Sequence, residues 1–278
     1  MADVITVVEF IQLIYKIPST LLMILSIYVI IKEIKNKNTF FNTQFYTIIV
    51  SKLTNEVIYI ITTFIFYKLP EWGFNNNFFK NNDWTATLSY ILAAQQTTFM
   101  FFITLLISIN RYIAVKYPLS FKVYFSKSRI NVILLSFIIF SIIIGLGNIL
   151  FNARYENSEL FEFFIPIFTS KNVIYYQIFY TVFLFGTISI ATCTFNVMAI
   201  LALKKRNLIG NKYKKELYYI IYSIFIFITL FFVEAFFVCR FIAVNYEIKI
   251  FVHVTEVFHI VVFDLTSFGD FYFLVYSW

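Results

Sequence analysis

A triplet with one basic residue, Asn110, Arg111 and Tyr112, stands at the end of a long apolar segment and is followed by Val115 and Pro118. A proline cannot continue a helix, so Pro118 predicts that the helix carrying Arg111 ends close to it. Arg111 is therefore expected at one surface of a membrane, where it either contacts a partner protein or locks its helix to a neighbouring one. A simpler alternative is that its long side chain only reaches the interface. Asn110 is uncharged, so it offers Arg111 a hydrogen-bond acceptor and no ion pair.

Charged residues inside apolar segments are the second chemical feature. Each would cost ~2.5–3.5 kcal/mol at the centre of a lone membrane helix, so these side chains are expected to face the interior of a bundle or one of its ends. Lys52 and Glu56 are four residues apart on one helical face and can pair. The pair either neutralises charge within its helix or acts with Asp264 as a switch, and Asp270 is expected to be solvated near the cytoplasmic surface. The other charged residues of this kind are Lys16, Glu234 and Glu256.

Polar and aromatic residues also gather in the half of the apolar segments that lies away from Arg111, the outer half in the topology predicted below. Such residues are suited to hold a small ligand in a largely apolar pocket. For any one of them, a hydrogen bond between two helices is the competing role. The candidate ligand-binding residues are Tyr59, Thr62, Tyr90, Gln95, Gln96, Tyr176, Tyr180, Glu234, His253 and Glu256.

No cofactor, metal site or catalytic site is predicted. His253, Glu256 and His259 follow one another at three-residue steps, which drift around a helix instead of keeping three ligands together. The sequence has no glycine-rich phosphate loop, no HExxH motif and no nucleophile elbow, which argues against an enzyme. Cys193 and Cys239 fall at opposite depths of two apolar segments, so a disulfide between them is not expected.

The composition places these residues in a membrane. Of the 278 residues, 60% are hydrophobic and 13% charged, and segments of ~18 or more apolar residues are long enough to cross a bilayer. We predict an all-α membrane protein, in which seven transmembrane helices form one bundle and one domain over residues 1–278. The expected spans are Phe10–Ile31, Phe45–Tyr67, Ala86–Ile109, Ile130–Phe151, Val173–Leu203, Leu217–Arg240 and Ile250–Tyr276.

The basic residues predict the orientation. Most of the 22 Lys and Arg residues lie in the three loops after spans one, three and five, including Lys204–Lys215. Because basic loops stay in the cytoplasm, the N-terminus is expected outside, and Lys68 and Arg240 fall in outer segments. No basic region precedes the first apolar segment, which is therefore expected to anchor a multi-pass protein in the cell membrane. A nucleic-acid partner is not expected, because the basic residues are divided among three short loops.

The segment from Asn110 to Pro118 is similar to the Asp/Glu-Arg-Tyr…Val…Pro element of rhodopsin-like G-protein-coupled receptors. Ile17-Pro18-Ser19, Glu216 after a basic loop, and the closing run from Asp264 to Ser277 resemble the nematode serpentine chemoreceptors of class gamma and the allied class V. The resemblance covers nearly the whole chain. It implies a chemosensory receptor that binds a small molecule and activates a heterotrimeric G-protein. The residues it implies for coupling are Asn110, Arg111, Tyr112, Val115 and Pro118.

The chain departs from this pattern at Asn110, which replaces the usual acid, and at Phe271, where a proline is usual. It also ends at Trp278 without a basic tail, so it is either a receptor without a tail or, as we expect, a truncated chain. A membrane transporter or a ligand-gated channel is the alternative function, but transporters usually have helices broken by Gly or Pro at their binding sites. With six Gly, four Pro and only Pro18 interrupting a span, the sequence favours a receptor in the lipid bilayer.

Overall fold

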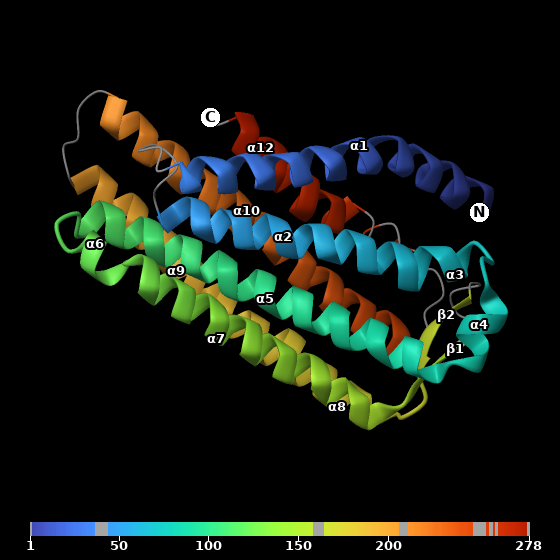
Figure 1. The fold of residues 1–278 in the computed structure, drawn as a ribbon. Helices are drawn as coiled ribbons and strands as arrows, with labels where there is room; N and C mark the ends of the chain where they lie inside the picture. The colour runs from blue at the N-terminus through green and yellow to red at the C-terminus, as the bar shows by residue number, and fades with distance from the viewer. Residues whose placement is uncertain are drawn as a thin grey trace.

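Long helices that lie side by side make up most of the molecule (Figure 1). The computed structural model describes residues 2–36, 44–157, 164–205, 211–246, 254–255, 258 and 261–276. The main helices are α1 (Ala2–Lys35), α2 (Gln44–Thr63), α5 (Asp83–Lys116), α7 (Lys127–Leu146), α9 (Phe185–Lys205), α10 (Asn211–Asn245) and α12 (Asp270–Tyr276). Shorter helices are α3 (Leu69–Glu71), α4 (Asn76–Asn81), α6 (Phe121–Tyr124) and α8 (Val173–Ile178).

Six of the described helical segments are long and apolar enough to cross a membrane: Ile11–Lys35, Gln44–Glu71, Asp83–Lys116, Lys127–Phe151, Val173–Lys205 and Glu216–Ile242. In a bilayer the backbone N–H and C=O groups must bond within their own segment, which is why such apolar segments are helical. Each segment overlaps one of the first six predicted spans. The seventh predicted span, Ile250–Tyr276, lies only partly within the described residues, where it includes α12. The chain is a multi-pass membrane protein.

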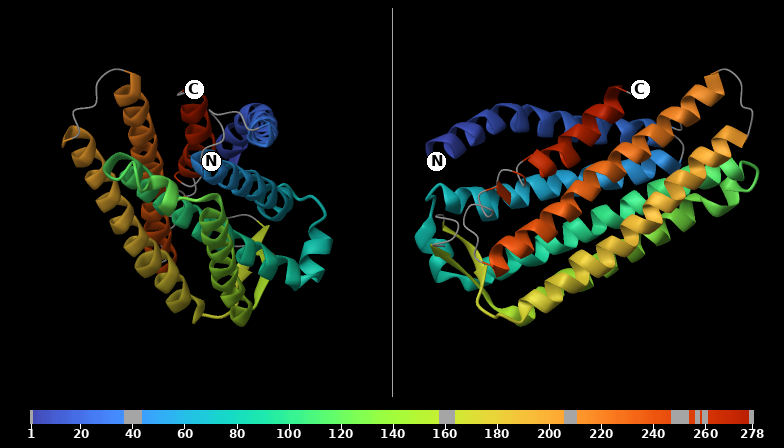
Figure 2. Two further views of the ribbon diagram at one scale, coloured as in Figure 1. Left: turned by 60° about the vertical axis from the view of Figure 1, so that its left-hand side comes forward. Right: turned by 180° about the vertical axis from the view of Figure 1, so that it is seen from behind.

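α5 is the central helix of the bundle. It packs against α2, α7, α9 and α10. In the most apolar stretch of α5, 72% of the residues are buried, against 17% in that of α1. α1 runs along the outside of the bundle (Figure 2), and its side chains such as Leu21 and Tyr28 are exposed, as contact with lipid requires. α5 ends at Lys116, two residues before Pro118, which confirms the helix end predicted from the proline.

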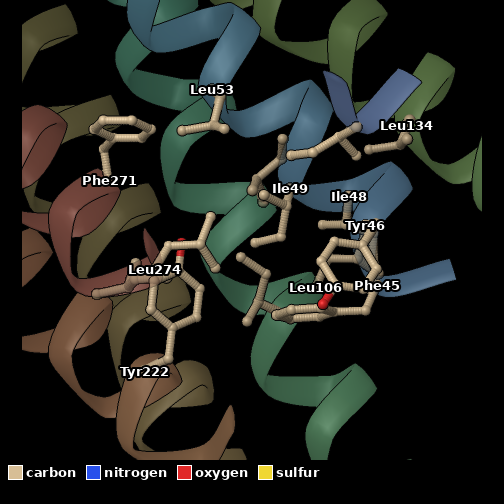
Figure 3. Packing of buried hydrophobic residues seen from close by; sticks show 14 of the residues in the cluster. Phe45, Tyr46, Ile48, Ile49, Leu53, Leu106, Leu134, Tyr222, Phe271 and Leu274 are labelled. Atoms are coloured by element: carbon tan, nitrogen blue, oxygen red, sulfur yellow. The ribbon is translucent and has the colours of Figure 1, made fainter. Parts of the chain in front are cut away.

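The larger hydrophobic core joins the two ends of the chain. Figure 3 shows Phe45 and Leu53 of α2 packed in one cluster with Tyr222 of α10 and Phe271 of α12. Phe271 stands where the resemblance leads to proline, and its side chain is fully buried in this cluster. A large aromatic ring therefore fills the interior at a position where a proline would leave space.

Two strands form a feature that the all-helical prediction omitted. β1 (Ala153–Asn157) pairs antiparallel with β2 (Phe164–Phe168). The Tyr155 hydroxyl donates to the carbonyl of Phe66 at 2.7 Å, and burial raises the pKa of Tyr155, so the hydroxyl remains a donor at physiological pH. Strands of five residues carry too short a pattern to be distinguished from loop. We call this end of the bundle the hairpin end, and the opposite end, where Arg111 lies, the arginine end.

Three helical turns among the described residues are wider than α-helical turns, with hydrogen bonds that reach five residues along the chain. They are η1 (Phe64–Lys68), η3 (Phe179–Leu184) and η4 (Leu265–Gly269), and a tight turn, η2 (Gly147–Phe151), follows α7. Single wide turns inside helices often mark functional sites, because the extra residue redirects the side chains around it. In this molecule η1 and η3 border a cavity, and η4 separates the partly buried Asp264 from the buried Asp270.

Candidate functional site

A cavity of about 250 Å³ lies at the hairpin end. It is bounded by α2 and η1, by α5, by β2, by α8 and η3, and by α10. Its walls are mainly aromatic, with several hydroxyl groups and a few charged side chains. The lining residues are Tyr59, Thr63, Tyr67, Lys68, Glu71, Tyr90, Ala93, Ala94, Thr97, Ile165, Ile174, Gln177, Tyr180, Thr181, Phe236, Phe237, Arg240, Phe241 and Phe263.

Three of the predicted ligand-binding residues line this cavity. Tyr59 stacks on Phe263 with 5.2 Å between ring centroids, the Tyr90 hydroxyl donates to the Pro166 carbonyl at 2.7 Å, and Tyr180 lies in η3. Tyr90 thus ties the cavity wall of α5 to the hairpin that covers it. Their part in binding a ligand stays a prediction.

The other described candidates join helices and do not line the cavity. Thr62 donates to Gln96 Oε1 at 3.0 Å, Tyr176 donates to the carbonyl of Ile144 at 2.5 Å, and Ser189 donates to Glu234 Oε2 at 2.7 Å. Gln95 lies where α5 passes close to Gly145 of α7. These residues lie outside this cavity, and their part in binding a ligand also stays a prediction. His253 and Glu256 lie outside the described residues.

Charged residues of the cavity were missed by the sequence analysis. Lys68 Nζ lies 2.7 Å from Glu71 Oε2, and the guanidinium of Arg240 lies 5.8 Å from the ring centroid of Phe236. Lys68 and Arg240 had been counted among the basic residues of the outer segments and left out of the ligand-binding candidates. The wide turn η1 and the length of α10, which continues to Asn245, keep both residues on helices at the rim of the cavity. Their positive charge is the one sequence feature that could have indicated Lys68 and Arg240 as cavity residues.

A buried ionic cluster joins α2, α10 and α12. Lys52 pairs with Glu56, as the four-residue spacing predicted, and Lys52 Nζ also lies 2.8 Å from Asp270 Oδ2. The Thr229 hydroxyl lies 3.4 Å from Asp270 Oδ1. The side chains of Lys52, Glu56 and Asp270 are 2%, 0% and 0% exposed. The prediction that Asp270 is solvated is wrong, because α12 packs against the bundle and brings Asp270 onto Lys52.

Asp264 belongs to a different group. Its Oδ1 lies 2.8 Å from Lys16 Nζ, and its Oδ2 accepts hydrogen bonds from Gln12, at 2.9 Å, and from Tyr15. These partners all come from α1. The wide turn η4 lies between Asp264 and Asp270, so the first faces α1 and the second faces α2. The grouping of Asp264 with Lys52 and Glu56 is therefore corrected.

Arg111 is enclosed at the arginine end. Its side chain is 4% exposed and its guanidinium carbon lies 4.3 Å from the ring centroid of Phe45 and 4.5 Å from that of Tyr219. Asn110 Oδ1 accepts hydrogen bonds from the guanidinium, including one from Nε at 3.1 Å. Arg111 Nη1 lies 3.9 Å from Glu216 Oε2 of α10. In this conformation a partner protein does not reach Arg111, and the contacts match the predicted lock between α5 and α10.

The rest of the Arg111 motif supports this arrangement. Tyr112 and Val115 are buried in a cluster with Leu203 of α9 and Ile220 of α10. Pro118 is exposed in the turn that follows α5. The apolar residues of the motif therefore hold α5 against α9 and α10, which sets the position of Arg111. Elsewhere in the bundle, Cys193 and Cys239 are both free.

In a comparison with known protein families, nearly the whole chain matches one family. A family model described as the Srg family chemoreceptor matches residues 9–277. No curated protein matches the chain. The matched region contains the cavity, the ionic cluster and the arginine end.

Proposed function

Because this chain belongs to the Srg family of chemoreceptors, we propose that it binds a small molecule in the cavity at the hairpin end and activates a heterotrimeric G-protein through the arginine end. The observation that carries the proposal is the course of α10. This helix lines the cavity with Phe236, Phe237 and Arg240 and reaches the Arg111 site with Glu216 and Tyr219. A single helix of 35 residues is about 50 Å long, so it can carry a displacement between the two sites.

The proposal includes seven transmembrane helices, with the N-terminus and the hairpin outside the cell membrane. Its support is the excess of basic residues in the loops at the arginine end, since such loops stay in the cytoplasm. The cavity would then face the outside, where an external chemical arrives, and Arg111 would face the cytoplasm. The described bundle is consistent with this because the hairpin end and the arginine end lie at opposite ends of α5.

The contacts of Arg111 support a resting state. Phe45, Tyr219, Asn110 and Glu216 occupy the faces of the guanidinium that a G-protein would need. Displacement of α10 would remove Tyr219 and Glu216 together, because both belong to that helix. Ligand binding between α5 and α10 would therefore expose Arg111 without unfolding any helix.

The cavity also indicates what holds the ligand. Tyr59, Tyr90 and Tyr180 offer aromatic faces, and Arg240 with the Lys68–Glu71 pair supplies the charged groups. A pocket with apolar walls and few polar groups gains affinity from the walls and orientation from the polar groups. A small, partly apolar molecule with one polar substituent fits this chemistry.

The cavity and the arginine end are tested by separate substitutions. Chemicals are screened on cells that express the receptor and a G-protein reporter, and a responding chemical is then tested on Phe237→Trp, which fills the cavity. Phe231→Trp is the matched control, because Phe231 lies on the same helix and is exposed on the outside of the bundle. We expect a lost or at least tenfold weaker response from Phe237→Trp and an unchanged response from the control.

Arg111→Ala tests the opposite end. It should abolish the reporter response while radiolabelled ligand still binds, because Arg111 and the cavity lie at opposite ends of the bundle. A normal response from Arg111→Ala at normal surface expression would contradict the proposed coupling. A ligand-evoked current in cells without the G-protein would favour a channel.

A further inference from the structure

The buried ionic cluster has unequal numbers of acids and bases. Lys52 supplies one positive charge, and Glu56 and Asp270 can supply two negative charges. The ionisable groups near Glu56 are Lys52 on its own helix, Asp270 on α12 and Tyr222 on α10. Thr229 of α10, which contacts Asp270, is neutral. With both carboxyls ionised, the cluster would carry an uncompensated negative charge in the interior of the bundle, which is a costly arrangement.

The hydrogen bonds distinguish the two carboxyls. Asp270 Oδ2 accepts from Lys52 at 2.8 Å, and Asp270 Oδ1 lies 3.4 Å from the Thr229 hydroxyl, which also contacts the carbonyl of Ile226 at 2.9 Å. Glu56 Oε1 accepts from Lys52, whereas Glu56 Oε2 is buried without a hydrogen-bond partner. An ionised carboxylate with a bare buried oxygen is unfavourable, because that oxygen loses its water and gains no donor. A proton on Glu56 Oε2 removes the excess charge of the whole cluster.

We propose that Glu56 is a proton-binding site of this receptor, and that separation of α12 from α2 during activation releases the proton. The coupling part rests on the proposed function. When Asp270 leaves Lys52, the ammonium group remains with Glu56 alone. That pair is neutral only if Glu56 loses its proton, so the step converts the carboxylic acid into a carboxylate that pairs with Lys52, and the proton passes to water.

The wide turn η4 gives α12 a place to move. Leu265–Gly269 lies directly before Asp270, and turns of this kind interrupt the regular hydrogen bonding of a helix and are sites where helices bend. A change at η4 would shift Asp270 relative to α2, while Asp264, on the other side of the turn, stays with Lys16 of α1. The ion pair between Lys52 and Asp270 is therefore the contact that opens.

The sign of the pH effect follows from the proton balance. The resting state holds one more proton than the active state, so acid favours rest and alkali favours activity. With one proton linked to the transition, the ratio of active to resting receptor changes by at most about tenfold per pH unit. Glu56→Gln keeps a neutral side chain of the same shape and cannot release a proton, so it should hold the receptor at rest with no such dependence.

Infrared spectroscopy of the purified receptor without ligand tests the proton site directly. A protonated carboxylic acid has a carbonyl band that a carboxylate lacks, and this band shifts in heavy water. We expect the band in the wild type and in Asp264→Asn, the control for an ion-paired acid elsewhere in the bundle, and its loss in Glu56→Gln. An identical band in Glu56→Gln, or none in the wild type, would overturn the proton site and leave the proposed function untouched.

Ligand-independent nucleotide exchange on a G-protein, measured in vesicles across a pH series, tests the coupling. We expect exchange by the wild type and by Asp264→Asn to rise with pH relative to Glu56→Gln, whose curve reports the pH response of the G-protein alone. Parallel curves for all three proteins, with the infrared band present, would overturn proton release on activation. No receptor-stimulated exchange by the wild type under any condition, with the band present, would count against the proposed function and leave the proton site standing.

Discussion

At the scale of single residues, Arg111 is a charged side chain that its neighbours enclose at the arginine end. Its guanidinium lies between the rings of Phe45 and Tyr219, and Glu216 stands 3.9 Å away. Cation–π contacts contribute about 0.5–2 kcal/mol each, depending on how far the cation is desolvated. Two such contacts therefore stabilise the enclosed arrangement as much as a good ion pair would. They act beside Asn110, which is neutral and gives Arg111 a hydrogen bond without an ion pair.

Asn110→Asp should lower the ligand-independent activity of the receptor. Asn110 Oδ1 already accepts from Arg111, and a charge-assisted hydrogen bond is roughly twice as strong as a neutral one. A gain of ~1.4 kcal/mol in the resting state would reduce a small active fraction about tenfold. Basal reporter output at matched surface expression measures the change.

Glu216→Gln is the control for this substitution and should change basal output in the opposite direction. It weakens the attraction of Arg111 to α10 and leaves Asn110 intact. Equal or higher basal output from Asn110→Asp would mean that Phe45, Tyr219 and Glu216 alone restrain Arg111, and the role assigned to Asn110 would be abandoned.

At the scale of elements, the bundle depends on close approach between particular helices. α7 crosses α5 at Gly145, where a Cβ atom would lie 2.6 Å from the backbone oxygen of Ile91. A backbone oxygen in a helix cannot move aside for this Cβ atom, whereas the end of a flexible side chain could. Two residues further along, the space beside Gly147 is filled by Tyr176, whose hydroxyl donates to the carbonyl of Ile144. The absence of a side chain at Gly145 thus sets how α7 meets α5, and its absence at Gly147 leaves room for Tyr176 of α8.

Gly145→Ala should therefore destabilise the receptor although alanine favours helices. The helical preference gains about 1 kcal/mol, but forcing α7 from α5 costs about 1–3 kcal/mol and disturbs the packing of Gln95. We expect a lower Tm of the purified protein in detergent, measured by thermal unfolding.

Gly186→Ala is the matched substitution. A Cβ at Gly186 would lie 3.1 Å from Glu234 Oε1, the end of a side chain that can move aside. The Tm should be unchanged or slightly higher. If Gly145→Ala behaved in the same way, the close approach of α7 to α5 would not limit the bundle.

At the scale of the whole molecule, the two ends of the bundle differ in chemistry. The hairpin end has a cavity with aromatic walls under a two-stranded lid. The arginine end has a tightly packed core around α2, α5, α10 and α12 (Figure 3). A cavity at one end and an enclosed charged group at the other is the arrangement that a receptor with intact helices requires.

The proposed orientation predicts which end meets the outside. In a protein lacking Cys193 and Cys239, a cysteine introduced at Asn157 in β1 should react with an impermeant thiol reagent on intact cells. One introduced at Asn211, at the start of α10, should react only after the cells are permeabilised. The two native cysteines must be replaced because Cys193 is exposed on the bundle and could itself react with the reagent. The reverse pattern would invert the topology and exclude the cavity as a site for external chemicals.

Features that depend on neighbours along the chain could be predicted from the sequence. Length and hydropathy determine the membrane helices, because a bilayer requires each segment to satisfy its own backbone. Pro118 determines where α5 ends, and the four-residue spacing of Lys52 and Glu56 determines their pairing, because both effects act within one helix. The match to the Srg family covers the same spans.

Features that join distant parts of the chain were decided only by the tertiary structure. Sequence placed Asp270 in solvent and offered Asp264 as a partner of Lys52 and Glu56 in a switch, whereas the packing of α12 and the wide turn η4 bury the first and direct the second to α1. It also left Lys68 and Arg240 out of the ligand-binding candidates, although η1 and the end of α10 bring them to the cavity. The physical reason is that hydropathy reports the depth of a residue in the membrane, while the direction of its side chain depends on which helices pack around it.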